Sequence, residues 1–392
     1  MKKQLFFLAI AATVSIAAIA AKSSGKGDKN PAADQALPAA VAQKILTGNL
    51  EIWSHSEPSQ PLDSQYVSLK KVLQENPDIS GVTLKFRWDY FHPAEKVINM
   101  AVLEKEVALC AAKGKKVELM ICPGLWTPQW VMDKGVDDIG PFVKDSKGLN
   151  GKAINIAKAP KVWDPIYKRL LMADLKLIAK KFNNNPTVTT VTIMGHNYQN
   201  AEMHAPDVTP LMISKGYSDD MVVKEMGEWM DFYATTFPTK KLLLCVSQSY
   251  SHSTTLPAKI VDLFISKYRS RAILDNHQLN GRKDASMGDS YLLPIFQKYL
   301  DVPVQYEMVG SFLEQPLRQG TPEMTIYNAC LAGPINNLRL WRRDCDDPKY
   351  ARDLIDVWNK YKGLTVAQFK AALIRDGKYI KDSDWKDGMP VK

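Results

Sequence analysis

The chain has 392 residues, 45% of them hydrophobic and 24% charged, which is the composition of a folded globular protein and excludes a disordered one. The formal net charge is +9, but the basic residues are scattered and form no helical stripe, finger or RNA-binding motif, which argues against specific nucleic-acid recognition. A basic surface of this kind could still favour an acidic glycan or an anionic envelope polymer as partner.

The amino terminus predicts a secretory signal peptide at residues 1–20. Lys2 and Lys3 precede an uncharged apolar run that ends in the cleavage motif Ala18-Ile19-Ala20. An uncleaved anchor is the alternative, but the run is short for a membrane span. We therefore expect a secreted or periplasmic protein with no membrane span after signal removal. Residues 21–44, rich in Lys, Ser, Gly, Pro and Ala, predict a flexible leader.

The segment 45–376 is typical of a parallel sheet with helical crossovers, because short β-branched or Leu-rich runs alternate with longer amphipathic runs. In chain order the predicted strands are 50–53, 82–86, 117–121, 188–193, 242–246, 272–274, 304–306 and 338–341. The helices that follow them are predicted at 65–75, 100–113, 165–182, 219–236, 257–268, 291–299, 323–331 and 350–360.

Eight strand–helix repeats predict a single-domain (β/α)8 TIM barrel of the α/β class, followed by a polar tail at 377–392. The alternative is a doubly wound open sheet. That fold would place a Gly-rich phosphate turn after its first strand, and the sequence has none there.

The five cysteines are odd in number and far apart, which matches neither a zinc site nor a dense disulfide framework. Export would permit one or two disulfides, and the sequence leaves their pairing open. The residues concerned are Cys110, Cys122, Cys245, Cys330 and Cys345.

Active sites of (β/α)8 barrels lie at the carboxyl ends of the strands, so the residues after each apolar run are the candidates for function. Glu202 follows the fourth predicted strand and Glu307 ends the seventh, and we expect them to be a pair of catalytic carboxylates. Aromatic, His and amide side chains surround them, as sugars require. We expect the following residues to bind the substrate: Trp53, His55, Arg87, Trp126, His196, Asn197, Asn200, His204, Gln248, His277, Tyr306 and Trp341.

Two carboxyl groups are what the cleavage of a glycosidic bond needs. A protonated one serves the leaving oxygen, and an ionised one serves the anomeric carbon of an oxocarbenium-like transition state. If the two lie about 5–5.5 Å apart, the ionised group attacks directly and configuration is retained. The fourth and seventh strands face each other across a barrel of eight, so this separation is within reach.

The second predicted strand carries a family resemblance. The run Gly81-Val82-Thr83-Leu84-Lys85-Phe86-Arg87-Trp88-Asp89-Tyr90-Phe91-His92-Pro93, with Asn99 and Leu103 after it, resembles the corresponding segment of clan A glycoside hydrolases such as families 5 and 42. Carboxylates after the fourth and seventh strands are that clan's defining arrangement. The resemblance covers most of residues 48–345 as architecture.

The resemblance implies a role for four residues. Glu202 would be the general acid/base, Glu307 the nucleophile, Arg87 the group that orients the nucleophile, and Trp341 the aromatic floor of the sugar site. It implies no cofactor and no metal.

The sequence departs from the clan pattern at two places. Ala201 stands directly before Glu202 where the clan has Asn, and Asn200 lies one position further back. The aromatic hydroxyl that contacts the nucleophile from the sixth strand is missing, with Asn276 and His277 at that level.

The surroundings of the two carboxyl groups should give them different pKa values. His196, His204 and Trp126 could hold Glu202 in a partly apolar pocket that keeps it protonated, while Arg87 beside Glu307 would keep that group ionised.

Structural readings compete with these assignments. Glu307 could be a surface carboxylate, Glu202 a helix cap or a partner of a lysine, and Arg87 one half of a structural ion pair. Trp53, Trp126 and Trp341 could be core residues.

Two other functions stay open: a barrel that binds glycans without cleaving them, and a metal-assisted hydrolase or lyase. For the second, the histidines lack H-x-x-x-H or H-E-x-x-H spacing. A serine hydrolase is disfavoured because the sequence has no G-x-S-x-G motif.

Overall fold

The computed structural model describes most of the chain beyond the amino-terminal segment. The described residues are 46–56, 62–144, 154–156, 158–198, 208–247, 253, 255–282, 292–381, 385–386 and 389–390. The expected signal peptide and leader lie outside these residues and stay predictions.

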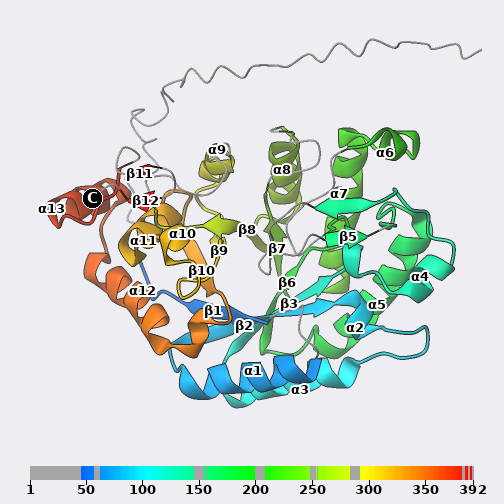
Figure 1. Cartoon of the computed structure of the whole chain (residues 1–392), viewed down its shortest axis with the longest axis horizontal. Coiled ribbons are helices and arrows are strands. Elements are labelled where there is room, and N and C mark those ends of the chain that lie inside the picture. Colours follow the sequence, from blue (N-terminus) through cyan, green and yellow to red (C-terminus); the bar gives the residue numbers. More distant parts are fainter. Residues whose placement is uncertain are drawn as a thin grey trace, which may run out of the picture. The chain divides into compact units, whose positions relative to one another are not determined.

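Eight parallel strands close into a barrel, which confirms the (β/α)8 prediction (Figure 1). Around the barrel the order is β1-β10-β9-β8-β7-β6-β3-β2, and β1 pairs with both β10 and β2 to close it. The strands are β1 (Ile52–His55), β2 (Ile79–Arg87), β3 (Lys116–Cys122), β6 (Val188–Thr192), β7 (Lys241–Cys245), β8 (Ala272–Leu279), β9 (Val304–Met308) and β10 (Ile335–Leu340).

Each predicted strand has its counterpart, but several end later than the apolar run suggested, β8 by the most. β8 continues through its polar residues to Leu279, which still pairs with Met308 of β9. Strands pair through their backbone groups. A polar side chain therefore does not end a strand when that side chain has a polar partner inside the barrel. The strand ends therefore carry polar groups that the barrel holds in place.

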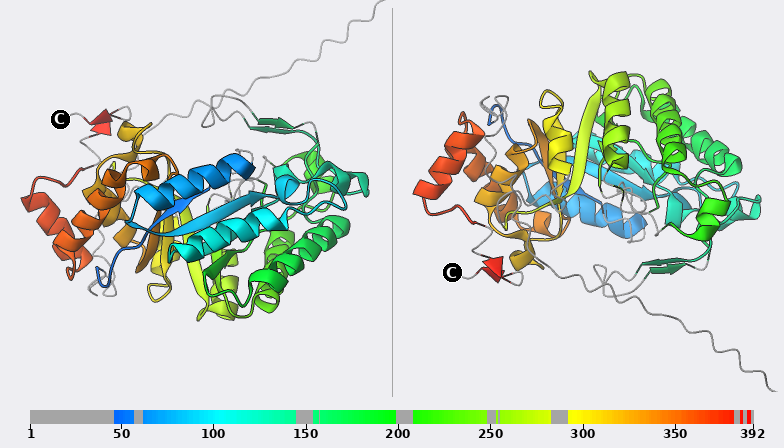
Figure 2. Two further views of the ribbon diagram at one scale, coloured as in Figure 1. Left: turned by 90° about the horizontal axis from the view of Figure 1, so that it is seen from below. Right: turned by 90° about the horizontal axis from the view of Figure 1, so that it is seen from above.

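Helices surround the barrel, and two further views show them on its outer side (Figure 2). The main ones are α1 (Leu62–Glu75), α3 (Met100–Ala112), α5 (Pro165–Phe182), α7 (Asp219–Thr236), α8 (Leu256–Tyr268), α9 (Leu292–Gln297), α11 (Pro322–Cys330), α12 (Pro348–Tyr361) and α13 (Val366–Arg375).

The bounds of α5 and α7 match the prediction because their start signals are strong. Asp164 caps α5 by accepting hydrogen bonds from the backbone of Ile166 and Tyr167, with Pro165 in the first turn. Ser218 caps α7 in the same way. Helix α13, whose Thr365 and Gln368 form a capping box, was not predicted as a separate element.

Short elements occupy the loops. They are α2 (Trp88–Phe91), a 3-10 turn at Gly124–Trp126, α4 (Gln129–Asp133), α6 (Pro210–Ser214), α10 (Pro316–Gln319), a 3-10 turn at Asp344–Asp346, and two hairpins, β4 (Phe142–Lys144) with β5 (Ile154–Ile156) and β11 (Trp385–Lys386) with β12 (Met389–Pro390). The long segment between β3 and α5 thus contains α4 and the β4–β5 hairpin.

The structure answers two questions that the sequence raised, one about disulfides and one about membrane-spanning helices. All five cysteines are buried and free, so none of them forms a disulfide. In the described part of the chain, no helix combines the length and the apolar character needed to cross a membrane.

One helix carries a buried acid without a partner. Glu106 of α3 is 0% exposed, and within the described residues neither of its carboxyl oxygens has a hydrogen bond. Burial raises its pKa to about 8 from the ordinary 4.5. The folded protein therefore keeps Glu106 protonated while the unfolded chain releases the proton above pH 4.5, so folding stability falls as pH rises between these two values.

Replacing Glu106 with Met should raise the free energy of unfolding at pH 7 by up to about 3 kcal/mol, since one pKa unit corresponds to about 1.4 kcal/mol. Urea unfolding between pH 5 and 8 measures it. Glu104→Met is the control on the same helix: Glu104 is a partly exposed partner of Lys181, and its loss should change stability by less than about 1 kcal/mol. If the free energy of unfolding changed equally with pH in the wild type and in Glu106→Met, Glu106 would not have the raised pKa described above.

Candidate functional site

Glu307 lies inside the carboxyl end of the barrel, as its place on the seventh barrel strand predicts. It belongs to β9 and is 6% exposed. Lys85 of β2 reaches it across the barrel and donates a hydrogen bond of 2.7 Å from Nζ to Oε2. Within the described part of the chain, no hydrogen bond reaches Oε1, whose neighbour is His55 Nε2 at 3.9 Å. Lys85 therefore holds Oε2, whereas Oε1 accepts no hydrogen bond from the described residues.

Four positively charged or protonatable groups surround the Glu307 carboxylate. Besides Lys85 and His55, Arg339 Nε lies 3.5 Å and His277 Nε2 lies 3.9 Å from Oε2. Burial alone would raise the pKa of Glu307, but His277, Lys85, His55 and Arg339 together hold that pKa well below its usual range. Glu307 is thus an ionised carboxylate in a buried place, which is the state that a nucleophile of glycoside cleavage needs.

His277 is oriented by a carboxylate of its own strand. Its Nε2 lies 2.9 Å from Asp275 Oδ2, and Arg339 contacts both Asp275 and His277. Burial lowers the pKa of His277, yet Glu307 and Asp275 outweigh burial and Arg339, so the pKa lies above its usual value of 6.5. Cys245 lies beside this pair, but the cation already seated against Asp275 and His277 is the Arg339 guanidinium.

Arg87 does not orient Glu307, which corrects the expectation from the family resemblance. It is half-buried at the end of β2, where Nε donates to Asp89 at 2.9 Å and Nη2 forms an ion pair with the same carboxylate. Its guanidinium stacks on the Tyr90 ring at 4.0 Å and faces Trp126 at 5.8 Å. Lys85, two residues earlier on the same face of the strand, takes the place beside Glu307.

Two further expected contacts with the substrate lie in the core instead. Trp53 is 2% exposed, donates to Glu51, and lies so close to Gly81 that a Cβ there would be 2.4 Å from its ring. Tyr306 is fully buried, and because side chains alternate along β9 it points away from the interior that Glu307 faces. Both therefore contribute to packing.

His55 does lie beside Glu307, and Trp341 lies beside His55. The Trp341 indole is half-buried, donates from Nε1 to the backbone oxygen of Met308 at 2.6 Å, and meets the His55 ring edge-on at 5.5 Å. This hydrogen bond fixes the ring at the end of the eighth barrel strand, where an aromatic floor was expected.

The loop after β6 packs closely against the loop after β3. His196 is 0% exposed, and its ring lies 6.0 Å from that of Trp163. Burial, with a smaller effect of Lys168, lowers the pKa of His196 to about 3, so the ring is neutral at ordinary pH. Asn197 is also buried, and its backbone oxygen would lie 2.3 Å from a Cβ at Gly124, which has φ +69°. Only a glycine fits at that turn.

Four expected site residues lie outside the described residues: Glu202, Asn200, His204 and Gln248. Glu202 as the acid/base, and the pocket that His204 was expected to contribute to, stay predictions.

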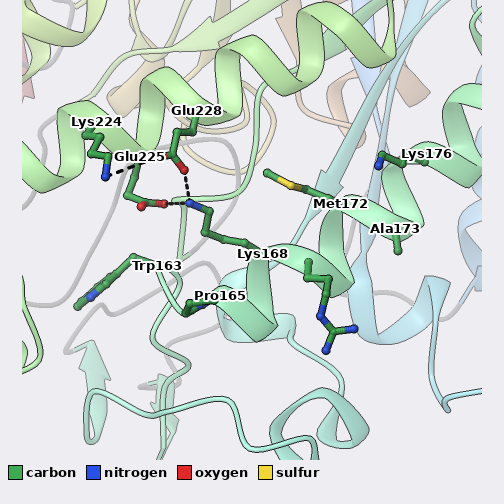
Figure 3. Close-up of a pocket in the computed structure, with 10 residues that line it drawn as sticks. Trp163, Pro165, Lys168, Met172, Ala173, Lys176, Lys224, Glu225 and Glu228 are labelled. Carbon is green, nitrogen blue, oxygen red and sulfur yellow. Dashed lines mark hydrogen bonds and ion pairs between the residues drawn. The ribbon is translucent and has the colours of Figure 1, made fainter.

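A separate groove of about 640 Å³ lies on the outer helical layer between α5 and α7 (Figure 3). Lys168 Nζ reaches Glu225 at 2.6 Å and also pairs with Glu228, as the dashed lines show. Trp163 lies at one side of this groove and Met172 at the other. The lining comes from the outer layer, so this groove does not contain Glu307.

Sequence reasoning missed Lys85, Asp275 and Arg339, although a signal for two of them exists. Lys85 lies in Val82-Thr83-Leu84-Lys85-Phe86-Arg87, and Arg339 lies in Leu338-Arg339-Leu340. In a strand covered on both faces, polar residues at every second position indicate an interior that is polar.

The fold is similar to those of solved glycoside hydrolases, whereas no family model and no curated protein matches the sequence. Two beta-galactosidases, from the psychrophilic Marinomonas ef1 and the Antarctic haloarchaeon Halorubrum lacusprofundi, share 11% and 12% identity at TM-scores of 0.50 and 0.51. They match 82% and 80% of this chain, which spans 61% and 58% of theirs.

A GH5_18 variant from Streptomyces cattleya, in complex with Manb1-4GlcNAc, matches 87% of this chain and 95% of its own at 11% identity and a TM-score of 0.50. At such identities the likeness concerns the fold, and at that level the resemblance to barrel glycoside hydrolases is confirmed.

The contact between Lys85 and Glu307 predicts strong energetic coupling. Lys85→Met and Glu307→Gln should each lower the free energy of unfolding by roughly 3–5 kcal/mol, because each leaves a buried charge without its partner. The double variant should lose less than the sum, with a coupling of at least about 2 kcal/mol.

Urea unfolding of the four proteins measures this coupling. The control cycle is Lys349→Met with Asp353→Asn, an exposed pair on α12, where roughly 0.5 kcal/mol or less is expected. A Lys85–Glu307 coupling as small as that of the control pair would mean that the two groups do not meet.

Proposed function

We propose that the protein is a glycoside hydrolase that cleaves O-glycosidic bonds of a polysaccharide or oligosaccharide with retention of configuration. Glu307 is the nucleophile and Glu202 the general acid/base. One observation carries the proposal: an ionised, buried carboxylate stands at the end of the seventh strand of a barrel whose fold resembles those of glycoside hydrolases.

The geometry around Glu307 suits attack on an anomeric carbon. Lys85 holds Oε2, so the carboxylate cannot rotate freely, and Oε1 carries the lone pair that forms the bond. The new ester forms as the glycosidic bond breaks, and the electrons of that bond leave with the oxygen, which takes a proton from the acid. Water then cleaves the ester, with the acid/base group accepting the proton.

The assignment of Glu202 rests on its position in the sequence. It follows β6, the fourth strand of the barrel along the chain, and β6 lies three places from β9 around the barrel order. A carboxyl group from a loop after that strand can reach a sugar held over Glu307, and retention requires the two groups to be about 5–5.5 Å apart.

The aromatic and charged groups at the carboxyl ends of the barrel strands suit a carbohydrate substrate. Trp341 offers an indole face fixed by its own hydrogen bond, and Arg87 with Tyr90 and Trp126 forms a half-buried cation and aromatic cluster at the end of β2. Sugars stack their C–H faces on aromatic rings and bond their hydroxyls to charged and amide groups.

A 2-fluoro glycoside of the matching sugar should add its mass to the peptide that contains Glu307. Glu307→Gln should remove this labelling and lower kcat by roughly a thousandfold or more, because the covalent step loses its nucleophile. Peptide mass spectrometry and steady-state kinetics measure the two effects.

The matched control is Glu51→Gln, since Glu51 pairs with Lys116 beside the start of β3, at the opposite end of the barrel, and should leave both readouts unchanged. A protein that binds glycans by calorimetry but is not labelled by any sugar configuration would be a binding barrel, not a hydrolase.

The pH profile should reflect the lowered pKa of Glu307. The reaction uses the ionised form, and that form persists as pH falls through 4.5, the ordinary glutamate value. The acid limb of kcat/KM is therefore expected below pH 4.5, and Lys85→Met should move it to higher pH. Circular dichroism at each pH separates this limb from acid unfolding. An acid limb at or above pH 4.5 in the folded wild type would contradict the assignment.

A further inference from the structure

Arg339 is a fully buried arginine whose guanidinium touches groups from four other strands. It lies on β10 with 0% exposure. Its Nη1 donates to Glu118 of β3 at 3.1 Å and to Thr83 of β2 at 3.4 Å. The other side of the guanidinium faces the site, where it contacts Asp275 and His277 of β8 and Glu307 of β9.

Glu118 holds the Arg339 guanidinium in place, because its own carboxylate is fixed by other side chains. It is fully buried, and three more side chains donate to its carboxylate: Thr192 at 2.6 Å, Gln305 at 2.6 Å and Thr83 at 3.3 Å. Asn337 in turn donates to Gln305 at 2.6 Å. Every oxygen of Glu118 is thus bonded, and the group cannot follow Arg339 if the arginine moves.

The fork of the guanidinium explains why an arginine is used at this position. One nitrogen is directed to Glu118 and the second to Asp275 and His277, while Nε lies 3.5 Å from Glu307 as an ion pair without a hydrogen bond, so one planar group makes all three sets of contacts. A lysine could supply the charge but has a single nitrogen for all of these contacts. The charge itself is secure, because Asp275, Glu118 and Glu307 raise the pKa of Arg339 above its usual value despite burial.

We propose that Arg339, anchored by Glu118, is a positioning residue that fixes the orientation of Glu307 and His277 and sets how readily this pair takes up a proton. The proposal deepens the proposed hydrolase function, and its consequence for rate rests on that function. Its electrostatic part concerns the folded protein alone and can be tested without any substrate.

The proton affinity of His277 depends on all the charged or titratable groups around it. On the described strands these are Asp275, Glu307 and Arg339 in contact, with Cys245, Lys85, His55 and Glu118 beyond them. Arg339 opposes protonation of His277 and favours the ionised form of Glu307. Removing its charge should therefore raise the pKa of both groups, whereas neutralising Glu118 leaves the arginine charge less compensated and should lower them.

The experiment is an NMR pH titration of the protein labelled at its six histidines, with His277→Gln used to assign the signal. Arg339→Met should move the His277 midpoint upward by about one pH unit. Glu118→Gln should move it downward. Arg339→Lys should leave the midpoint near that of the wild type but lower kcat more than it changes KM, because charge is kept and direction is lost.

The matched control is Arg271→Met. Arg271 is a half-buried arginine bonded to the backbone oxygens of Lys240, Ala234 and Phe237, so its loss should reduce stability without moving the His277 midpoint. A purely structural role for Arg339 would give the same result as this control.

Opposite shifts in Arg339→Met and Glu118→Gln support the proposal. A His277 midpoint unchanged in folded Arg339→Met, or shifts of the same sign in both variants, would overturn it. If Arg339→Met does not fold, Glu118→Gln decides: a downward shift supports the proposal, and no shift or an upward one overturns it. Absence of glycosidase activity with the expected NMR shifts would refute the proposed function and leave the role of Arg339 intact.

Discussion

Charge buried inside a barrel has to be balanced inside the barrel, because each unpaired ion costs several kcal/mol to remove from water. Among the residues that the structure describes, the interior of this barrel holds two permanent cations and three carboxylates: Lys85, Arg339, Glu118, Asp275 and Glu307. Together they carry a formal net charge of −1. A proton on His277 brings this net charge to zero, in agreement with the raised pKa of that ring. The charge of Glu307 is thus a property of the whole cluster.

The two members of the expected catalytic pair differ in their relation to the barrel strands. Glu307 belongs to a strand, and residues on several other strands hold it, so its position is part of the barrel itself. Glu202 follows β6 in the sequence and lies outside the described residues, so its proposed role rests on that position in the sequence. What the structure contributes to the proposed chemistry is therefore the nucleophile and its electrostatic surroundings.

Much of the fold could be predicted from the sequence because its signals are local. Strand and helix alternation, the Asp164 and Ser218 caps and the spacing of the repeats lie within a few residues of each other. The place of Glu307 on a strand, though not its proposed role, could be predicted for the same reason, since a strand end is visible in the sequence. The partner of Glu307 could not be predicted, because Lys85 and Arg87 are both basic and lie on one face of β2, two residues apart near its end.

Which of these side chains meets a carboxylate on a distant strand depends on register across the barrel, and no local pattern encodes register. Asp89, two residues beyond Arg87, offers that arginine a nearer partner. Trp53 and Tyr306 failed as predicted contacts with the substrate for a related reason. Both adjoin a strand end, but Trp53 lies at the level of Gly81, near the start of β2, and Tyr306 faces the helical layer.

The most direct test of an ionised Glu307 beside a protonated His277 is to locate the protons of the buried cluster. Neutron diffraction from a deuterium-exchanged crystal at about pH 6 would locate them in a single measurement. We expect a Glu307 carboxylate without deuterium and a His277 ring with deuterium on both nitrogens. A deuterium on either Glu307 oxygen, with His277 singly protonated, would contradict this expectation, because the buried carboxylate would then not be the ionised group that the proposed reaction needs.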